Sequence, residues 1–309
     1  MMQEQLLYTI ALGLVIFLVF LWVVIGYSII IRQSRYVTRS KIDAFFIQKL
    51  SMEYAESNAL NVPTHLHNDQ TIAIKLNNGR KLQYASSILI RVQDTFYSEN
   101  DNMIEQVCKE SGIYKEINKK IKKQNWYPKA MAIWLSYELD LKSHLTCIKP
   151  LISHKNVLVR REAQIGLVRF WGWKSLKILP QLKYPISLWQ QIRIIENLMD
   201  YFPIPDLTYM NKALETQNPF GIELLIRLIR RFEMHAYKNY VIEQLAHPNK
   251  NVSETAIEVL ETFDLNADQL YKIENLLTLL PTANQPIRIS QLIALQQVPT
   301  NKEKQHGNN

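Results

Sequence analysis

Apolar residues in the second half of the chain recur with the spacing of an amphipathic helix, and this pattern is itself repeated along the sequence. Val159, Ala163, Leu167 and Phe170 stand at i, i+4, i+8 and i+11, which places them on one helix face. A constant sequence offset gives three more sets: Gln190, Ile194, Leu198 and Tyr201; Gly221, Leu225, Ile229 and Phe232; Val252, Ala256, Leu260 and Phe263. The second and third positions are always apolar, and the fourth is always aromatic. An internal repeat with a period of about 31 predicts stacked helical hairpins.

The same register extends to both sides of these four sets. Earlier and later copies, the later one with a one-residue slip, are formed by Pro128, Ala132, Ser136 and Leu139, and by Asn284, Arg288, Leu292 and Leu295. A second helix per unit is expected between the stripes, and Asn156, Ser187 and Asn251 are expected to cap the helices that follow them. The prediction is an all-α fold, with a right-handed α-solenoid of helix hairpins over residues 126–300 and a disordered tail at 301–309.

One segment carries a family resemblance. Residues 151–163, LISHKNVLVRREA, combine a helix end, a short Asn turn and a Val-Arg-x-x-Ala pattern, and this resembles the core of a HEAT repeat. Residues 245–256 are similar but have Ser253 where the family usually has arginine, and the units at 182–202 and 214–233 lack the Val-Arg pair. The resemblance implies that Arg160 bonds neighbouring turns. It implies a fold rather than an activity.

The N-terminal segment, residues 1–31, is far more apolar than the rest of the chain. The run from Leu6 to Ile31 contains no charged side chain. As a helix it would reach about 39 Å, more than the ~30 Å hydrocarbon core of a bilayer. A cleaved signal peptide fits less well, because Met1–Gln5 contains no Lys or Arg and no small-residue cleavage site closes the run. We therefore expect a transmembrane anchor at residues 1–31.

Basic residues follow the apolar run directly. Arg32, Arg35, Arg39 and Lys41 stand on its C-terminal side, with no basic residue on the other side. The positive-inside rule then predicts a single-pass protein whose remaining chain lies in the cytoplasm. An anchor followed by HEAT-like units is also similar to a group of bacterial envelope proteins, which implies the inner membrane. We expect the four basic residues to face lipid headgroups.

Residues 32–125 form a predicted juxtamembrane helical region. Ser40 is expected to cap a separate helix that runs to about Ser57, followed by a loop at residues 58–70 and either loop or a short strand up to residue 76. Two further helices are predicted at 102–108 and 114–123, with a break at Ser111-Gly112. Ile113, Ile117 and Ile121 form the apolar stripe of the second. Its lysines would lie on the opposite face, either solvated or in contact with lipid headgroups: Lys119, Lys120, Lys122 and Lys123.

Composition and motifs give little sign of chemistry. The net charge is +8 with a pI of about 9.2, which permits an anionic partner without requiring one. Cys108 and Cys147 match no metal or redox spacing, and His65 and His67 lack further ligands beyond Asp69. No HExxH, GxSxG, P-loop, GxGxxG or CxxC motif occurs. We expect no enzyme activity, no cofactor and no resident metal.

Two features of the repeats are candidates for binding. Arginines and a glutamine on successive helices are either solvated and locally paired or form a basic strip for a partner: Arg161, Gln164, Arg193, Arg227, Arg230 and Arg231. The tryptophans outside the anchor, Trp126, Trp134, Trp171, Trp173 and Trp189, either pack in the core or form an exposed patch that docks a protein.

These features favour a membrane-tethered cytoplasmic scaffold that binds a protein partner through its solenoid. Such a scaffold could be an accessory subunit of a membrane complex that makes or exports envelope polysaccharide. The alternative is a nucleic-acid-binding enzyme that resembles HEAT-like alkylpurine DNA glycosylases, since the chain is basic and rich in tryptophan. A membrane tether is awkward for scanning a genome, so a nucleic acid is not the expected partner, and neither is a small-molecule substrate.

Overall fold

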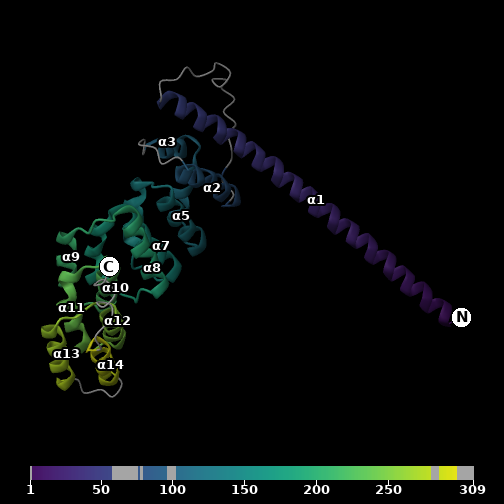
Figure 1. Ribbon diagram of the computed structural model, residues 1–309. Coiled ribbons are helices and arrows are strands. Elements are labelled where there is room, and N and C mark those ends of the chain that lie inside the picture. Colours follow the sequence, from purple (N-terminus) through teal and green to yellow (C-terminus); the bar gives the residue numbers. More distant parts are fainter. Residues whose placement is uncertain (1, 58–75, 77–78, 96–101, 280–284, 298–309) are drawn as a thin grey trace, which may run out of the picture. The chain divides into compact units, whose positions relative to one another are not determined.

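The computed structural model describes residues 2–57, 76, 79–95, 102–279 and 285–297, and no β-strand occurs among them. The expected all-α class is therefore confirmed for the described part of the chain (Figure 1). Two compact units are present: unit 1 comprises Met1–Lys123 and Glu138–Leu141, and unit 2 comprises Gln124–Tyr137 and Lys142–Asn309. The loop predicted at residues 58–70, the strand alternative up to residue 75 and the predicted tail at 301–309 lie outside the described residues.

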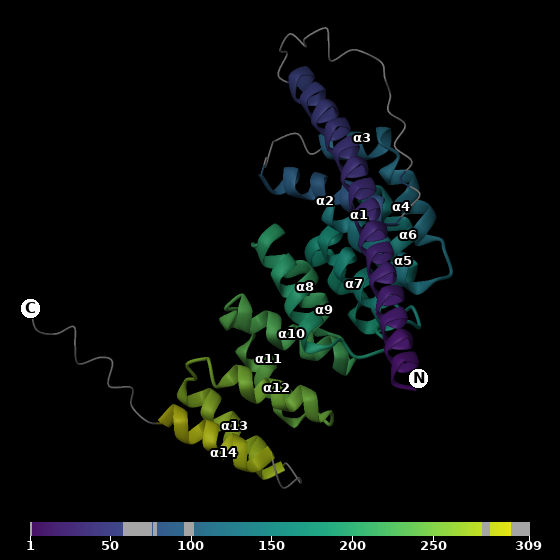
Figure 2. The same ribbon diagram turned by 90° about the vertical axis from the view of Figure 1, so that its right-hand side faces the viewer.

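Helix α1, Met2–Ser57, is one continuous element that runs from the apolar segment into the body of unit 1 (Figures 1 and 2). The prediction that Ser40 begins a new helix is wrong. No glycine or proline interrupts residues 32–57, and the hydroxyl of Thr38 bonds back to the carbonyl of Ser34 at 2.9 Å inside the helix. The described apolar side chains between Leu12 and Ile30 are exposed, and the helix is long and apolar enough to cross a membrane. Membrane anchors and signal sequences share these properties.

The core of unit 1 lies against the second half of α1. Ile42 and Phe46 of α1 are fully buried, and α2 (Gly79–Thr95) and α3 (Asn102–Glu110) pack on this helix. The ammonium of Lys49 on α1 donates to Glu110 on α3 at 2.8 Å, and this bond holds the pKa of the glutamate below its usual range. Burial raises the pKa of Cys108 on α3 to about 12, so this thiol stays protonated at neutral pH.

Helix α4, Ile113–Ile121, follows Gly112, which adopts a φ of 78° and allows the chain to turn after α3. The predicted stripe of Ile113, Ile117 and Ile121 is buried, as expected. Lys120 is also buried, with 8% exposure, so the prediction that it faces solvent or lipid is wrong. It stands seven residues after Ile113 and three after Ile117, and these spacings place it on the apolar face. Lys119, Lys122 and Lys123 are exposed.

Five longer helices of unit 2 coincide with the predicted stripes. They are α5 (Trp126–Glu138), α7 (Val157–Trp171), α8 (Leu188–Tyr201), α10 (Pro219–Arg231) and α12 (Lys250–Leu260). Asn156 and Ser187 cap α7 and α8 as predicted, with side chains that accept from the backbone N–H groups of Leu158 and Gln190. The cap of α12 is Asn249 and not Asn251, because the Oδ1 of Asn249 accepts the N–H of Asn251 at 3.0 Å.

The connecting elements are shorter and less regular than the predicted second helices. They are η2, α6 and η3 (Lys142–His144, Leu145–Ile148, Lys149–Leu151); η4 (Gly172–Gln181); α9 (Leu207–Leu214); and η5, α11 and η6 (His235–Tyr237, Lys238–Glu243, Gln244–Ala246). Two of them contain prolines, Pro150 and Pro180, that remove a backbone donor. Helices α13 (Ala267–Leu279) and α14 (Gln285–Gln297) complete unit 2.

The repeat columns correspond to packing positions in unit 2. The second and third positions are buried in all four full sets, from Ala163 and Leu167 to Ala256 and Leu260. The aromatic fourth position varies, from buried Phe263 to exposed Tyr201. Helix α7 packs on α8, α8 on α10, α10 on α12, and α12 on α14. This order is compatible with a helical-repeat solenoid.

Candidate protein-binding groove

The outward side chains of α5, α7, α8 and α10 line two neighbouring hollows on unit 2. The first is a hollow of about 420 Å³ between α5, α7 and α8, and the second is a hollow of about 740 Å³ between α8 and α10. Helix α8 contributes to both: Trp189 and Arg193 line the first, while their neighbours Leu188 and Ile192 line the second. We call this combined surface the α8 groove.

Large apolar side chains are exposed in the α8 groove. Trp126 and Tyr127 at the start of α5 are 42% and 57% exposed, and Trp189 on α8 is 54% exposed. Leu188 and Ile192, one turn apart on α8, are also exposed. A cluster of aromatic and aliphatic residues of this kind is typical of a protein-binding surface, where tryptophan and tyrosine supply much of the binding energy.

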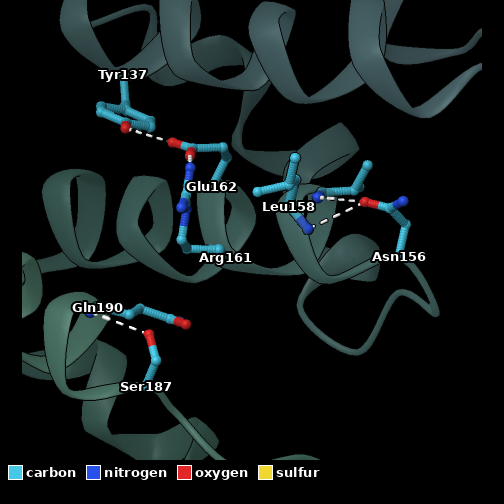
Figure 3. A network of polar contacts seen from close by, with 8 residues as sticks. Tyr137, Asn156, Leu158, Arg161, Glu162, Ser187 and Gln190 are labelled. Carbon is cyan, nitrogen blue, oxygen red and sulfur yellow. Dashed lines mark hydrogen bonds and ion pairs between the residues drawn. The ribbon is translucent and has the colours of Figure 1, made fainter.

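A buried carboxylate positions one arginine of the groove (Figure 3). Glu162 on α7 is 7% exposed and accepts hydrogen bonds from the hydroxyl of Tyr137 at 2.6 Å and from Nη2 of Arg161 at 2.7 Å. The guanidinium of Arg161 lies 4.9 Å from the centroid of the Trp189 ring, which is within cation–π distance. Tyr137 packs closely against Gly166, where an added Cβ would lie 3.0 Å from the tyrosine ring. The arginine and the tryptophan are therefore held together before any partner binds.

The remaining arginines differ in how far they are paired. Arg193 forms an ion pair with Glu196 at 3.4 Å, and Arg227 lies 3.8 Å from both Glu223 and Glu258. Arg230 and Arg231 near the end of α10 are exposed, and neither forms an ion pair with a carboxylate of the described residues. Nε of Arg231 lies 2.9 Å from the sulfur of Met199. Among the described arginines of the groove, Arg230 and Arg231 are thus the ones without an ion pair.

Two residues near the groove have structural roles. Gln164 was expected to face outward, but it is 3% exposed; it donates to the carbonyl of Ile152 at 2.8 Å and accepts a bond from Gln190. Helix α7 has a neighbouring helix on two sides, so an arc wider than the apolar stripe is buried. Arg160 donates to the carbonyl of His154 at 2.8 Å and stacks on Tyr184, in agreement with the turn-bonding role that the HEAT resemblance implies.

The tryptophans divide between the two alternatives that the sequence left open. Trp173 is buried, donates to the carbonyl of Phe202 at 2.9 Å and lies edge-on to Phe232. Trp126 and Trp189 are exposed in the α8 groove, and Trp134 lines it. Exposure cannot be derived from the sequence, because all of these tryptophans lie in helical segments with similar apolar surroundings.

The predicted lipid-facing residues of α1 lie on the surface of unit 1. Arg32, Arg35, Arg39 and Lys41 are all exposed. The guanidinium of Arg39 lies 5.0 Å from the centroid of the Tyr84 ring on α2. These positions follow the apolar part of α1 within the same helix.

Comparison of the chain with models of known protein families and with curated protein sequences gives no match.

Proposed function

We propose that this chain is a membrane-anchored helical-repeat adaptor that binds a segment of a partner protein through the α8 groove. In this proposal α1 spans the membrane, the HEAT-like units form a right-handed solenoid, and the basic residues after the apolar run keep both units in the cytoplasm. The exposure of Trp126, Tyr127 and Trp189 in a groove lined by arginines is the observation that supports it most. Such residues are costly to leave in water unless a partner covers them.

The chemistry of the groove favours an acidic, amphipathic protein segment. Among the described residues of the two hollows, Arg161, Arg193 and Arg227 each form an ion pair with a glutamate, whereas Arg230 and Arg231 form none. Carboxylates of the partner would pair with Arg230 and Arg231, and its aromatic or aliphatic side chains would fill the hollow between Trp126 and Trp189. Buried apolar anchors would supply the affinity, and the charges would select the partner and its orientation.

Site-specific photo-crosslinking of the full-length protein in its own cells tests this proposal. A photoreactive amino acid at Trp189 should give a defined protein adduct, whereas the same residue at Tyr271, which is exposed on α13, should not. Mass spectrometry of the adduct should identify a segment rich in Asp or Glu and apolar residues. Equal adducts from both positions, or no protein adduct at Trp189, would contradict the proposed groove.

A matched pair of charge reversals separates specific pairing from general attraction. Arg230→Glu with Arg231→Glu should lower the yield of the Trp189 adduct roughly tenfold, because like charges then face each other. Lys183→Glu with Lys272→Glu makes the same change in net charge at exposed positions outside the groove and should leave the yield unchanged. Duplex DNA bound at the groove, with affinity that falls steeply with salt, would favour the glycosylase-like alternative instead.

A further inference from the structure

A basic hollow lies between α1 and α2 in unit 1, apart from the α8 groove. Its volume is about 620 Å³, and its lining includes Arg35 and Arg39 from α1 and Arg80 and Lys81 from α2. Among the residues that the structure describes, none that lines this hollow carries a carboxylate. Four cationic side chains from two helices that are distant in sequence therefore line one hollow.

One of these cations is held in place by a chain of contacts. The hydroxyl of Tyr84 on α2 donates to the carboxylate of Asp43 on α1, at 2.8 Å and 3.1 Å to its two oxygens. The pKa of Tyr84 is raised, first by burial and then by this bond. The tyrosine ring in turn lies under the guanidinium of Arg39. Asp43 thus positions Tyr84, and Tyr84 positions Arg39, which lowers the entropic cost of binding an anion.

The first turn of α2 strengthens the preference for an anion. Helix α2 begins at Gly79, and both Arg80 and Lys81 stand in its first turn. The N-terminus of a helix carries partial positive charge and presents backbone N–H groups to anions. Arginine also matches the geometry of phosphate oxygens with two parallel N–H groups. The hollow therefore suits a phosphate group better than a single diffuse negative charge.

The position of the hollow along α1 indicates where the phosphate comes from. Arg35 and Arg39 follow the end of the apolar run at Ile31 by four and eight residues, which corresponds to about 6 Å and 12 Å along the helix. The headgroup layer of a bilayer extends roughly 5–8 Å beyond the hydrocarbon core on each side. If α1 spans the membrane, the long side chains of both arginines reach the depth at which lipid phosphates lie.

We propose that this hollow is a binding site for the phosphate of an anionic phospholipid headgroup. The inference depends on the membrane span in the proposed function. It goes beyond general attraction to an acidic membrane, because it assigns the lipid to a defined pocket built by Arg35, Arg39, Arg80 and Lys81. The bound lipid would fix the rotation of α1 about its axis and hold α2 close to the bilayer.

Native mass spectrometry of the full-length protein in detergent, titrated with phosphatidylglycerol or phosphatidylcholine, provides the test. The wild type should bind phosphatidylglycerol about tenfold more tightly than phosphatidylcholine. Arg35→Gln with Arg39→Gln should lower that affinity roughly tenfold, as should Arg80→Gln with Lys81→Gln. Lys109→Gln with Lys115→Gln removes two charges at exposed positions of unit 1 outside the hollow and should keep the affinity within about twofold. Equal losses of affinity in all three variants, or no loss in the variant with both α2 substitutions, would contradict the proposal that the lipid binds in this hollow.

Two further measurements separate this site from the anchor and from soluble anions. Glycerol 3-phosphate should bind far more weakly than phosphatidylglycerol. Equal affinities would show that the hollow binds a soluble phosphate and would contradict a phospholipid as its ligand. All variants should float with vesicles made only of phosphatidylcholine. A wild type that does not float would contradict the proposed anchor, whereas one that floats without preferring phosphatidylglycerol would contradict only the lipid site. Circular dichroism of each variant confirms that its helices are intact.

Discussion

At the scale of single residues, Glu162 links the interior of unit 2 to the α8 groove. Its two oxygens accept from Tyr137 on α5 and from Arg161 on α7, so that one carboxylate joins two helices and orients the arginine beside Trp189. Hydrogen bonds that involve a buried charge contribute more to stability than neutral ones. Glu162 thus stabilises the packing of α5 on α7 through Tyr137 and also orients Arg161 at the surface of the α8 groove.

Substitution of Glu162 by glutamine should destabilise unit 2. The variant keeps the shape of the side chain but removes the charge that Tyr137 and Arg161 bond, and the free energy of unfolding should fall by about 1–3 kcal/mol. Urea unfolding of the full-length protein in detergent, followed by circular dichroism, measures the change. Glu196→Gln removes the exposed partner of Arg193 and should change stability by less than about 0.5 kcal/mol. Equal effects of the two substitutions would contradict a buried role for Glu162.

Which side chains face outward was the least predictable property at this scale. Gln164 and Lys120 are both polar and stand beside apolar stripes, yet both are buried. A helical stripe predicts the centre of a buried face but not its width, which depends on how many neighbours the helix has. Arg161, in contrast, lines the α8 groove, and its contacts with Glu162 and Trp189 depend on how α7 and α8 pack, which the sequence does not show.

At the scale of elements, the repeat period predicted the long helices of unit 2 well and the connecting elements poorly. Asn156 and Ser187 cap their helices because a side-chain oxygen next to an apolar stripe is a strong local signal. The segment at 172–181 begins at a glycine with φ of 55° and contains Pro180, and it forms a 3₁₀ helix. It packs against α7 and α9, and the sequence carries no periodic signal for these contacts.

Two of the helix N-caps each have a histidine two residues before the capping asparagine. The sequence did not predict a role for either histidine. Nδ1 of His154 accepts the backbone N–H of Asn156, and Nδ1 of His247 accepts that of Asn249. In both cases the asparagine is the N-cap of the next long helix. Burial lowers the pKa of both histidines, and the charges of Lys129, Lys155 and Arg160 add to this for His154. Each bond also requires that Nδ1 carry no proton.

These caps should make the stability of unit 2 depend on pH. Below the ordinary histidine pKa of about 6.5, the unfolded chain takes up protons that the folded caps resist, so the free energy of unfolding falls as the pH falls. The melting temperature of the wild type should drop by a few degrees between pH 7.5 and 5.5. His154→Asn with His247→Asn retains an acceptor that does not titrate in this range and should show a smaller drop. His235→Asn alters an exposed histidine outside the caps and should behave like the wild type; identical drops in all three proteins would exclude the caps as the cause.

At the scale of the whole molecule, α1 connects a membrane-compatible segment to unit 1 without a break. The sequence predicted the apolar run and the basic flank but divided the helix at Ser40. Continuity matters because Arg35 and Arg39 are then placed by the same rigid element that would enter the bilayer. That α2 brings Arg80 and Lys81 to these arginines could not be predicted, since the residues between the two helices carry no periodic pattern.

The apolar run should remain on the mature protein as an uncleaved anchor. It is longer than a typical signal-peptide core and no small-residue cleavage site closes it, so a signal peptidase should not remove it. The protein made by its own cells should contain peptides from the apolar run and stay in the membrane pellet after carbonate extraction, whereas a chain without residues 2–31 should be released. An alkaline phosphatase fused at the C-terminus should be inactive, because the positive-inside rule predicts that the side of the span with Arg32, Arg35, Arg39 and Lys41 faces the cytoplasm. Active phosphatase would reverse the orientation and place the α8 groove outside the cytoplasm, and a shortened chain would show that the run is a signal sequence.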